Sequence, residues 1–150
     1  MNSSDTSPEI DLYERGVSLV EVAAALAVTT LLASVAIPQL SGLLTRTSIH
    51  SEALALRLFL ERTYIHVLSS RQGVSIDCSE QILVARRETG EPVATHLVRR
   101  GITLDVASIP ERKLLIHPTG TTSPATLELK KGTMSCLVIM SLRGRMRVTC

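Results

Sequence analysis

One uninterrupted apolar segment near the N-terminus limits what this chain can fold into. Residues 17–37 form a run of 21 residues in which Glu21 is the sole charged side chain. A helix of that length rises about 31 Å, close to the ~30 Å hydrocarbon core of a bilayer. The mean hydropathy of +0.25 fits one membrane helix joined to a small domain.

Three interpretations of the apolar segment compete. It is a plain membrane anchor, a secretory signal peptide cleaved at Ser34-Val35-Ala36, or a segment processed at its cytoplasmic edge. Signal peptides have a basic first region and an apolar stretch of about 7–15 residues. Residues 1–16 instead hold four acidic residues against Arg15, and the apolar stretch is longer. The third interpretation therefore fits best.

The hexapeptide GVSLVE, residues 16–21, closely resembles the prepilin motif of type IV pilins and type II secretion pseudopilins. Pro38 follows Gly16 at the spacing where that family favours proline. The resemblance implies that prepilin peptidase cuts between Gly16 and Val17, and that the new N-terminal Val17 is methylated. The chain departs from the family in having Val17 where Phe is favoured, and in its acidic leader.

Glu21 then becomes the fifth residue of the mature chain. In the family this glutamate is thought to pair with the N-terminal amine of a neighbouring subunit, which makes Glu21 and Pro38 candidate assembly residues. An ion pair between packed helices lowers the cost of a carboxylate in lipid, roughly 2.5–3.5 kcal/mol when it is alone. The alternative is that Glu21 reaches the membrane interface from near the helix start.

Helical character continues beyond Pro38, where a bend is expected because proline removes one hydrogen bond. Apolar residues at helical spacing predict a broad buried face; they are Ala53, Leu56, Leu60 and Tyr64, with Leu54, Leu58 and Ile65 adjoining. Glu52, Arg62 and His66 are expected on the opposite, polar side.

After Ser69 the pattern changes to short β-like runs separated by turn residues. The predicted strands are Val74–Cys78, Ile82–Arg86, His96–Arg99, Ile102–Val106, Lys113–Ile116, Thr126–Lys130, Cys136–Met140 and Arg145–Thr149. The predicted class is α+β, with a long N-terminal helix, transmembrane and then amphipathic, packed on an antiparallel β domain. The expected segments are a leader (1–16), a transmembrane half-helix (17–37), a periplasmic half-helix (38–70) and a β-rich domain (71–150).

The C-terminal half, LLIHPTGTTSPATLELKKG followed by CLVIMSLRGRMRV, resembles the H-type minor pseudopilins and their pilus relatives, the GspH/FimT group. Pro118 and Gly120 keep that group's turn, although Ile116 replaces its Phe, and residues 144–148 match its GRVRV ending. The resemblance implies a long helix packed against two antiparallel sheets.

The three cysteines include no CxxC pair, which argues against a zinc site. A hairpin closed by residues 142–144 places Cys136 opposite Cys150, and export makes a disulfide between them plausible. A two-residue turn breaks this pairing and leaves Cys78 as an alternative partner.

Arg143, Arg145 and Arg147 alternate with apolar residues, so a strand places all three on one face. Residues 71–150 also carry twelve Lys and Arg against seven Asp and Glu. The arginines either keep a sheet edge soluble or bind phosphates, with Lys130 and Lys131 contributing if they lie nearby.

No catalytic motif, metal-ligand cluster or cofactor site is recognisable, and the four histidines are scattered. We therefore expect no enzyme and no cofactor. The leading hypothesis is a minor pilin or minor pseudopilin in the inner membrane, with other pilins or pseudopilins and prepilin peptidase as partners. The alternatives are a DNA-binding minor pilin that aids DNA uptake, and an ordinary anchored periplasmic domain.

Overall fold

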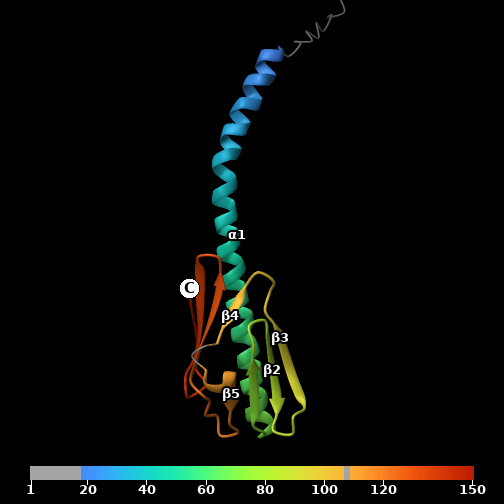
Figure 1. Cartoon of the computed structure of the whole chain (residues 1–150), viewed down its shortest axis with the longest axis vertical. Helices are drawn as coiled ribbons and strands as arrows, with labels where there is room; N and C mark the ends of the chain where they lie inside the picture. Colours follow the sequence, from blue (N-terminus) through green and yellow to red (C-terminus); the bar gives the residue numbers. More distant parts are fainter. Residues whose placement is uncertain (1–17, 107–108) are drawn as a thin grey trace, which may run out of the picture. The chain divides into compact units, whose positions relative to one another are not determined.

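The computed structural model describes residues 18–106 and 109–150. Its main element is helix α1 (Leu19–Ser70), which passes through Pro38 without interruption (Figure 1). The chain divides into two units, one up to Gln39 and one from Leu40 to Cys150. The candidate cleavage residues Gly16 and Val17 lie outside the described residues.

The N-terminal half of helix α1 is exposed along its whole described length, although its side chains are mostly apolar. Threonine hydroxyl groups in this half donate hydrogen bonds to backbone carbonyls of the preceding turn: Thr29 to Leu26 at 2.9 Å and Thr30 to Ala27 at 2.9 Å. These bonds let a polar residue sit on an apolar helix. Helix α1 is the one described helix that is long and apolar enough to cross a membrane.

In the part of the chain that the structure describes, eight strands follow the helix and form two four-stranded antiparallel sheets. Their bounds are β1 (Val74–Cys78), β2 (Ile82–Arg87), β3 (Pro92–Leu97), β4 (Thr103–Asp105), β5 (Lys113–Ile116), β6 (Ala125–Lys131), β7 (Met134–Met140) and β8 (Met146–Thr149). The first sheet has the order β3-β2-β1-β5, and the second β4-β6-β7-β8. A short 3₁₀ turn, η1 (Pro110–Arg112), precedes β5.

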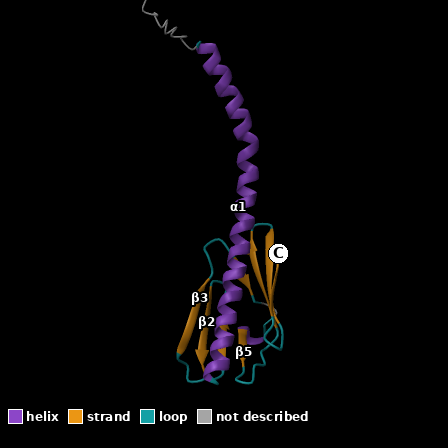
Figure 2. Ribbon diagram, turned by 180° about the vertical axis from the view of Figure 1, so that it is seen from behind, coloured by secondary structure: helices purple, strands orange, loops and turns teal. Residues whose placement is uncertain are grey.

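The C-terminal half of helix α1 lies across one face of both sheets (Figure 2). Its buried side chains recur at helical spacing and are Ile49, Ala53, Leu56, Leu60 and Val67. Each buried Leu or Ile contributes about 1.5–3 kcal/mol by leaving water. The α+β class and the helix packed on two antiparallel sheets are confirmed.

All eight predicted strands exist, and Val74–Cys78 and Lys113–Ile116 have the predicted bounds. The third differs most: β3 is Pro92–Leu97, whereas His96–Arg99 was expected. Its edge position explains the error, because an edge strand tolerates proline at its first residue. The polar position expected for Glu52 is also wrong, since this side chain is buried in the helix–sheet interface.

Candidate assembly helix and arginine row

Glu21 lies in the first turn of helix α1, where its backbone N–H donates to the Ser18 carbonyl at 2.9 Å. The exposed N–H groups of a helix start favour a negative charge nearby. Val20 and Val22 beside it are exposed, as are the larger apolar side chains further along. The carboxylate therefore belongs to an apolar helical surface that can pack against other helices.

Arg143, Arg145 and Arg147, called here the arginine row, begin in the turn between β7 and β8 rather than in strand β8. Ser141 N–H donates to the Arg145 carbonyl at 2.9 Å, and Gly144 N–H donates to the Ser141 carbonyl at 2.9 Å. Arg143 and Arg145 thus belong to the turn, and Arg147 to β8. From Arg145 onward, exposed and half-buried residues alternate as predicted.

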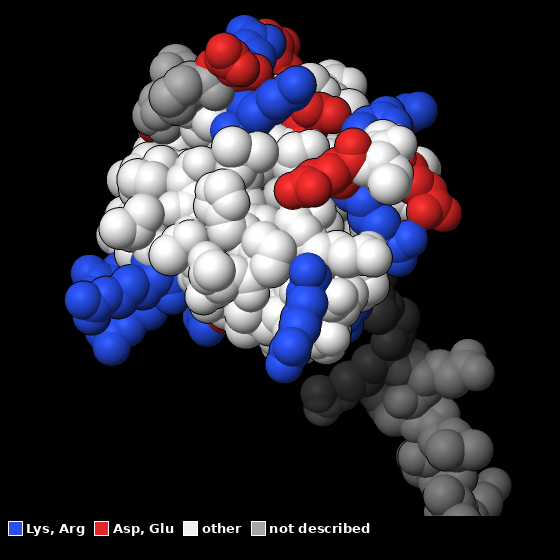
Figure 3. Space-filling model, turned by 90° about the horizontal axis from the view of Figure 1, so that it is seen from below, with Lys and Arg blue, Asp and Glu red and all other residues white. Residues whose placement is uncertain are grey.

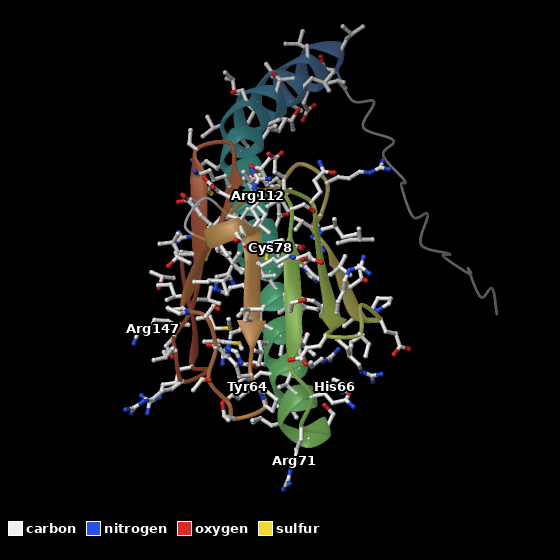
Figure 4. The ribbon with its side chains drawn as sticks, turned by 60° about the horizontal axis from the view of Figure 1, so that its bottom comes forward. Tyr64, His66, Arg71, Cys78, Arg112 and Arg147 are labelled. Atoms are coloured by element: carbon white, nitrogen blue, oxygen red, sulfur yellow. A yellow bond between two sulfur atoms is a disulfide. The ribbon has the colours of Figure 1, made fainter. Side chains whose placement is uncertain are left out.

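A groove of about 540 Å³ runs between this turn and helix α1. Arg145 and Arg147 line it from one side and Arg57 and Glu61 from the other, with Ile139 between them. The Arg57 charge is engaged, because its Nε lies 2.8 Å from Glu61 Oε1. Figure 4 shows Arg147 projecting outward from the second sheet. Among the described residues, no acidic side chain forms an ion pair with Arg143, Arg145 or Arg147.

Lys130 and Lys131 do not join the row. They pair with Ser135 and Met134 at the start of β7, whereas Arg147 pairs with Ile139 near its end. Lys130 Nζ lies 3.1 Å from both Asp105 Oδ2 and Glu128 Oε2. Hydrogen bonds to these carboxylates raise the pKa of Lys130. On the face seen in Figure 3, the cationic side chains lie in separate groups around a broad uncharged surface.

Tyr64 of helix α1 contacts two turns, one at Gly120 and one at Gly144, which belong to the two C-terminal motif segments. Its hydroxyl donates to the Gly120 carbonyl at 3.1 Å, and its ring lies against Gly144. A Cβ atom at position 144 would overlap that ring, and the backbone there has a φ of +71°, which favours glycine. Gly120 has a φ of +85°. The glycines of both motif segments thus meet one aromatic side chain.

Cys136 and Cys150 form a disulfide, with their sulfur atoms 2.04 Å apart. Strands β7 and β8 pair Leu137 with Thr149 and Val138 with Val148, so the register that follows from a three-residue turn is present. The bond fastens the last residue of the chain to the start of β7.

Cys78 is free and buried. Burial, with a further contribution from the adjacent Asp77 charge, raises the pKa of its thiol to about 12. The thiol is therefore protonated and unreactive at neutral pH. The residues that the structure describes contain no cluster of three or more His, Cys, Asp or Glu suited to a metal ion.

No protein-family profile matches the chain, and no curated protein matches it by sequence. Solved structures that resemble it in fold include a minor pilin and a minor pseudopilin. The type IV minor pilin FimU of Pseudomonas aeruginosa has a TM-score of 0.59 at 20% identity, covering 70% of this chain and 90% of FimU. The minor pseudopilin EpsH from the Type 2 Secretion System of Vibrio cholerae has a TM-score of 0.57 at 14% identity, covering 68% of this chain and 96% of EpsH. The chain has the fold of the minor pilins and minor pseudopilins.

Proposed function

We propose that the chain is a minor pilin or minor pseudopilin, a structural subunit of a type IV pilus or a type II secretion pseudopilus. One observation carries the proposal: a single helix has an exposed apolar N-terminal half and a C-terminal half packed on two antiparallel sheets. Such a helix can anchor the chain in a membrane and later pack with similar helices. An ordinary anchored domain needs no prepilin motif at residues 16–21.

The proposed chain has a leader (1–16), a transmembrane segment (17–37), a periplasmic half-helix (38–70) and a β-rich domain (71–150). It crosses the inner membrane once, with its C-terminal domain in the periplasm. Its partners are other pilins or pseudopilins, together with prepilin peptidase during processing. Glu21 pairs with the amine of a neighbouring subunit, and Pro38 bends the helix to suit the filament.

The first prediction concerns processing at the membrane edge. In cells with prepilin peptidase, the membrane-bound chain should begin at Val17 and carry an N-terminal methyl group. Mass spectrometry of the intact protein measures both, and cells lacking the peptidase provide the control. A chain that begins at Ile37 establishes a signal peptide instead, and a chain that keeps residues 1–16 contradicts the processing.

A second candidate function is DNA binding by the arginine row. Arg145 and Arg147 line a groove without an ion-pair partner among the described residues, which supports phosphate binding. Aromatic residues are 2% of the sequence, so base stacking contributes little. Binding should therefore rest on phosphate contacts and show little sequence preference.

The second prediction follows from the number of cations. Neutralising three phosphates on duplex DNA gives a slope of log affinity against log salt of about −2.7. Titration of the full chain in non-ionic detergent at several salt concentrations measures this slope. Arg145→Gln with Arg147→Gln should reduce the slope and the affinity, whereas Arg99→Gln with Arg100→Gln is the charge-matched control. Absence of binding at low salt, or binding that the first variant leaves unchanged, contradicts the DNA-binding function.

A further inference from the structure

Strand β8 leaves one edge of the second sheet open, since β7 is its one strand neighbour among the described residues. Two other sheet edges are covered by the chain itself. Ser123 N–H donates to the Leu115 carbonyl of β5 at 2.9 Å, and Leu104 N–H of β4 donates to the Glu80 carbonyl at 3.1 Å. Figures 1 and 2 show the remaining edges, β3 and the strand next to the C-terminus, on opposite sides of the β domain. Strand β3 contains no Lys, Arg, Asp or Glu, so the charged open edge is that of β8.

The backbone of β8 alternates between groups that face β7 and groups that face the open edge. Ser141 N–H donates to the Arg145 carbonyl at 2.9 Å, which makes these residues a hydrogen-bonded pair. Hydrogen-bonded and non-hydrogen-bonded pairs alternate along an antiparallel ladder. Arg147 is therefore bonded to β7, whereas the N–H and C=O groups of Met146 and Val148 point away from β7. These groups are free to bond a further strand.

The position of the disulfide agrees with this alternation. Cys150 follows Val148 by two residues, so it should also belong to a non-hydrogen-bonded pair. The Cα atoms of Cys136 and Cys150 lie 4.2 Å apart. This distance is near the ~4.5 Å of non-hydrogen-bonded pairs and well below the ~5.5 Å of hydrogen-bonded ones.

The side chains along this edge give its two faces different chemistry. Arg145 and Arg147 are exposed on one face, and Met146 and Val148 are half-buried on the other. The groove of about 540 Å³ between the β7–β8 turn and helix α1 leaves room for side chains beside the edge. A strand added here places every second side chain next to the arginines and the others next to the apolar pair.

The arginine face of the edge has no counter-charge of its own. Residues 112–150 contain seven Lys and Arg and one acidic residue, Glu128. The Glu128 carboxylate is engaged with Lys130 at 3.1 Å, and Glu61 across the groove is engaged with Arg57 at 2.8 Å. Charged side chains on an edge strand normally discourage further pairing. Because like charges opposite one another are destabilising, β8 selects for a strand that brings negative charge.

We propose that the open edge of β8 binds an extended acidic segment of another polypeptide, which adds a strand to the second sheet. Carboxylates of the segment lie opposite Arg145 and Arg147, and its apolar side chains lie beside Met146 and Val148. Its backbone bonds the outward N–H and C=O groups of the apolar pair. A nucleic acid supplies negative charge but no backbone ladder, so a peptide matches both features of this edge. The inference goes beyond the proposed structural role and requires neither the membrane segment nor a filament.

The probe is a fluorescently labelled synthetic peptide of alternating Glu and Val, titrated against the full chain in non-ionic detergent and followed by fluorescence anisotropy. We expect this peptide to bind, and a peptide of alternating Lys and Val not to bind. Methylating the backbone nitrogens of the Val residues keeps every side chain but removes the donors that face β8, so it should abolish binding. Arg145→Gln with Arg147→Gln should weaken binding about 2- to 30-fold, the range for two cross-strand ion pairs. The charge-matched control, Arg99→Gln with Arg100→Gln, should bind as the unaltered chain does.

Hydrogen exchange reports on the edge itself. At a free peptide concentration one hundred times its Kd, the amides of Met146 and Val148 should exchange up to about a hundred-fold more slowly. Equal binding of the N-methylated peptide, or binding without protection of these amides, overturns strand addition and leaves a contact between charges alone. Absence of peptide binding at low salt also overturns it. If duplex DNA then binds to the same arginines, the row serves a nucleic acid instead.

Discussion

At the scale of single residues, Glu52 shows how a buried charge fastens helix α1 to the first sheet. Its Oε1 lies 3.1 Å from His96 Nε2 on the edge strand β3, and its side chain is 7% exposed. His96 in turn packs against Phe59, with ring centroids 5.5 Å apart. A buried carboxylate is tolerated when hydrogen bonds and counter-charges surround it. Glu52 therefore positions β3 on the helix.

The third prediction is that Glu52→Ala lowers the free energy of unfolding by about 2–3 kcal/mol, because it leaves buried polar groups of His96 without a partner. Glu52→Gln keeps an oxygen acceptor at the same place and should lose less than half as much. Urea unfolding of the full chain in detergent, followed by circular dichroism, measures both values. Equal losses in the two variants contradict the hydrogen-bonded role.

At the scale of elements, strand β8 has few backbone attachments. It is four residues long, forms one edge of the second sheet and pairs with β7 alone. The side chains of Met146 and Val148 pack against the core and are only partly buried. The remaining constraints are the turn held by Tyr64 and the disulfide at Cys150. The position of the arginine row therefore depends on the disulfide at one end of β8 and on the packing of Tyr64 against the turn at the other end.

The fourth prediction concerns the disulfide. A cross-link closing a loop of about 15 residues stabilises a protein by about 3 kcal/mol in the chain-entropy model. Reduction, or Cys136→Ala with Cys150→Ala, should lower the unfolding free energy by about 2–4 kcal/mol. Hydrogen exchange should show β8 opening before β6 and β7, because β8 is the edge strand.

Thiol titration checks the pairing behind this prediction. The unreduced native chain should show no reactive thiol near neutral pH, because burial holds Cys78 in its protonated form. The unreduced denatured chain should show one thiol, and Cys78→Ala should abolish it. Three thiols in unreduced periplasmic material contradict the disulfide.

At the scale of the whole molecule, helix α1 carries exposed apolar side chains in each of the two units. In the Leu40–Cys150 unit they include Leu54, Leu58 and Ile65, whose exposed fractions are 39%, 50% and 63%. These three residues were expected within a broad apolar face, yet the sheets cover only its other half. An exposed apolar stripe of this kind is typical of a surface that packs against a partner.

The fifth prediction tests the role of Glu21 in assembly. Glu21→Ala should insert into the membrane at least as well as the unaltered chain, since an apolar residue is more stable in lipid. Its share in filaments should fall roughly ten-fold or more, because a buried amine then lacks its counter-charge. Co-expression with the other pilins and quantification of sheared filaments measure the share, and Val22→Ala is the neighbouring control. Normal incorporation contradicts the ion pair.

The features that the sequence alone determined are local ones. The apolar run of residues 17–37 predicts a membrane-length helix because rise per residue and bilayer thickness are fixed quantities. Alternation predicts strands, but the sequence left two turn lengths open, and the hydrogen bonds of the turn between Ser141 and Arg145 decide the register that sets Cys136 opposite Cys150. The resemblance of residues 16–21 and Pro38 to the prepilin motif implies a pilin-like fold without reference to packing.

Tertiary structure decided the features that depend on residues far apart in the chain. Helical spacing placed Glu52 on a polar face, yet β3 covers that position, because His96, 44 residues further along the chain, lies against it. Arg57 lines the same groove as Arg145 and Arg147 only because α1 packs on the second sheet. The same packing brings Tyr64 into contact with both Gly120 and Gly144. Lys130 and Lys131 lie apart from the row because β7 separates the two turns by its length. Periodicity reports which side chains share a face of one element, whereas packing between elements determines what that face meets.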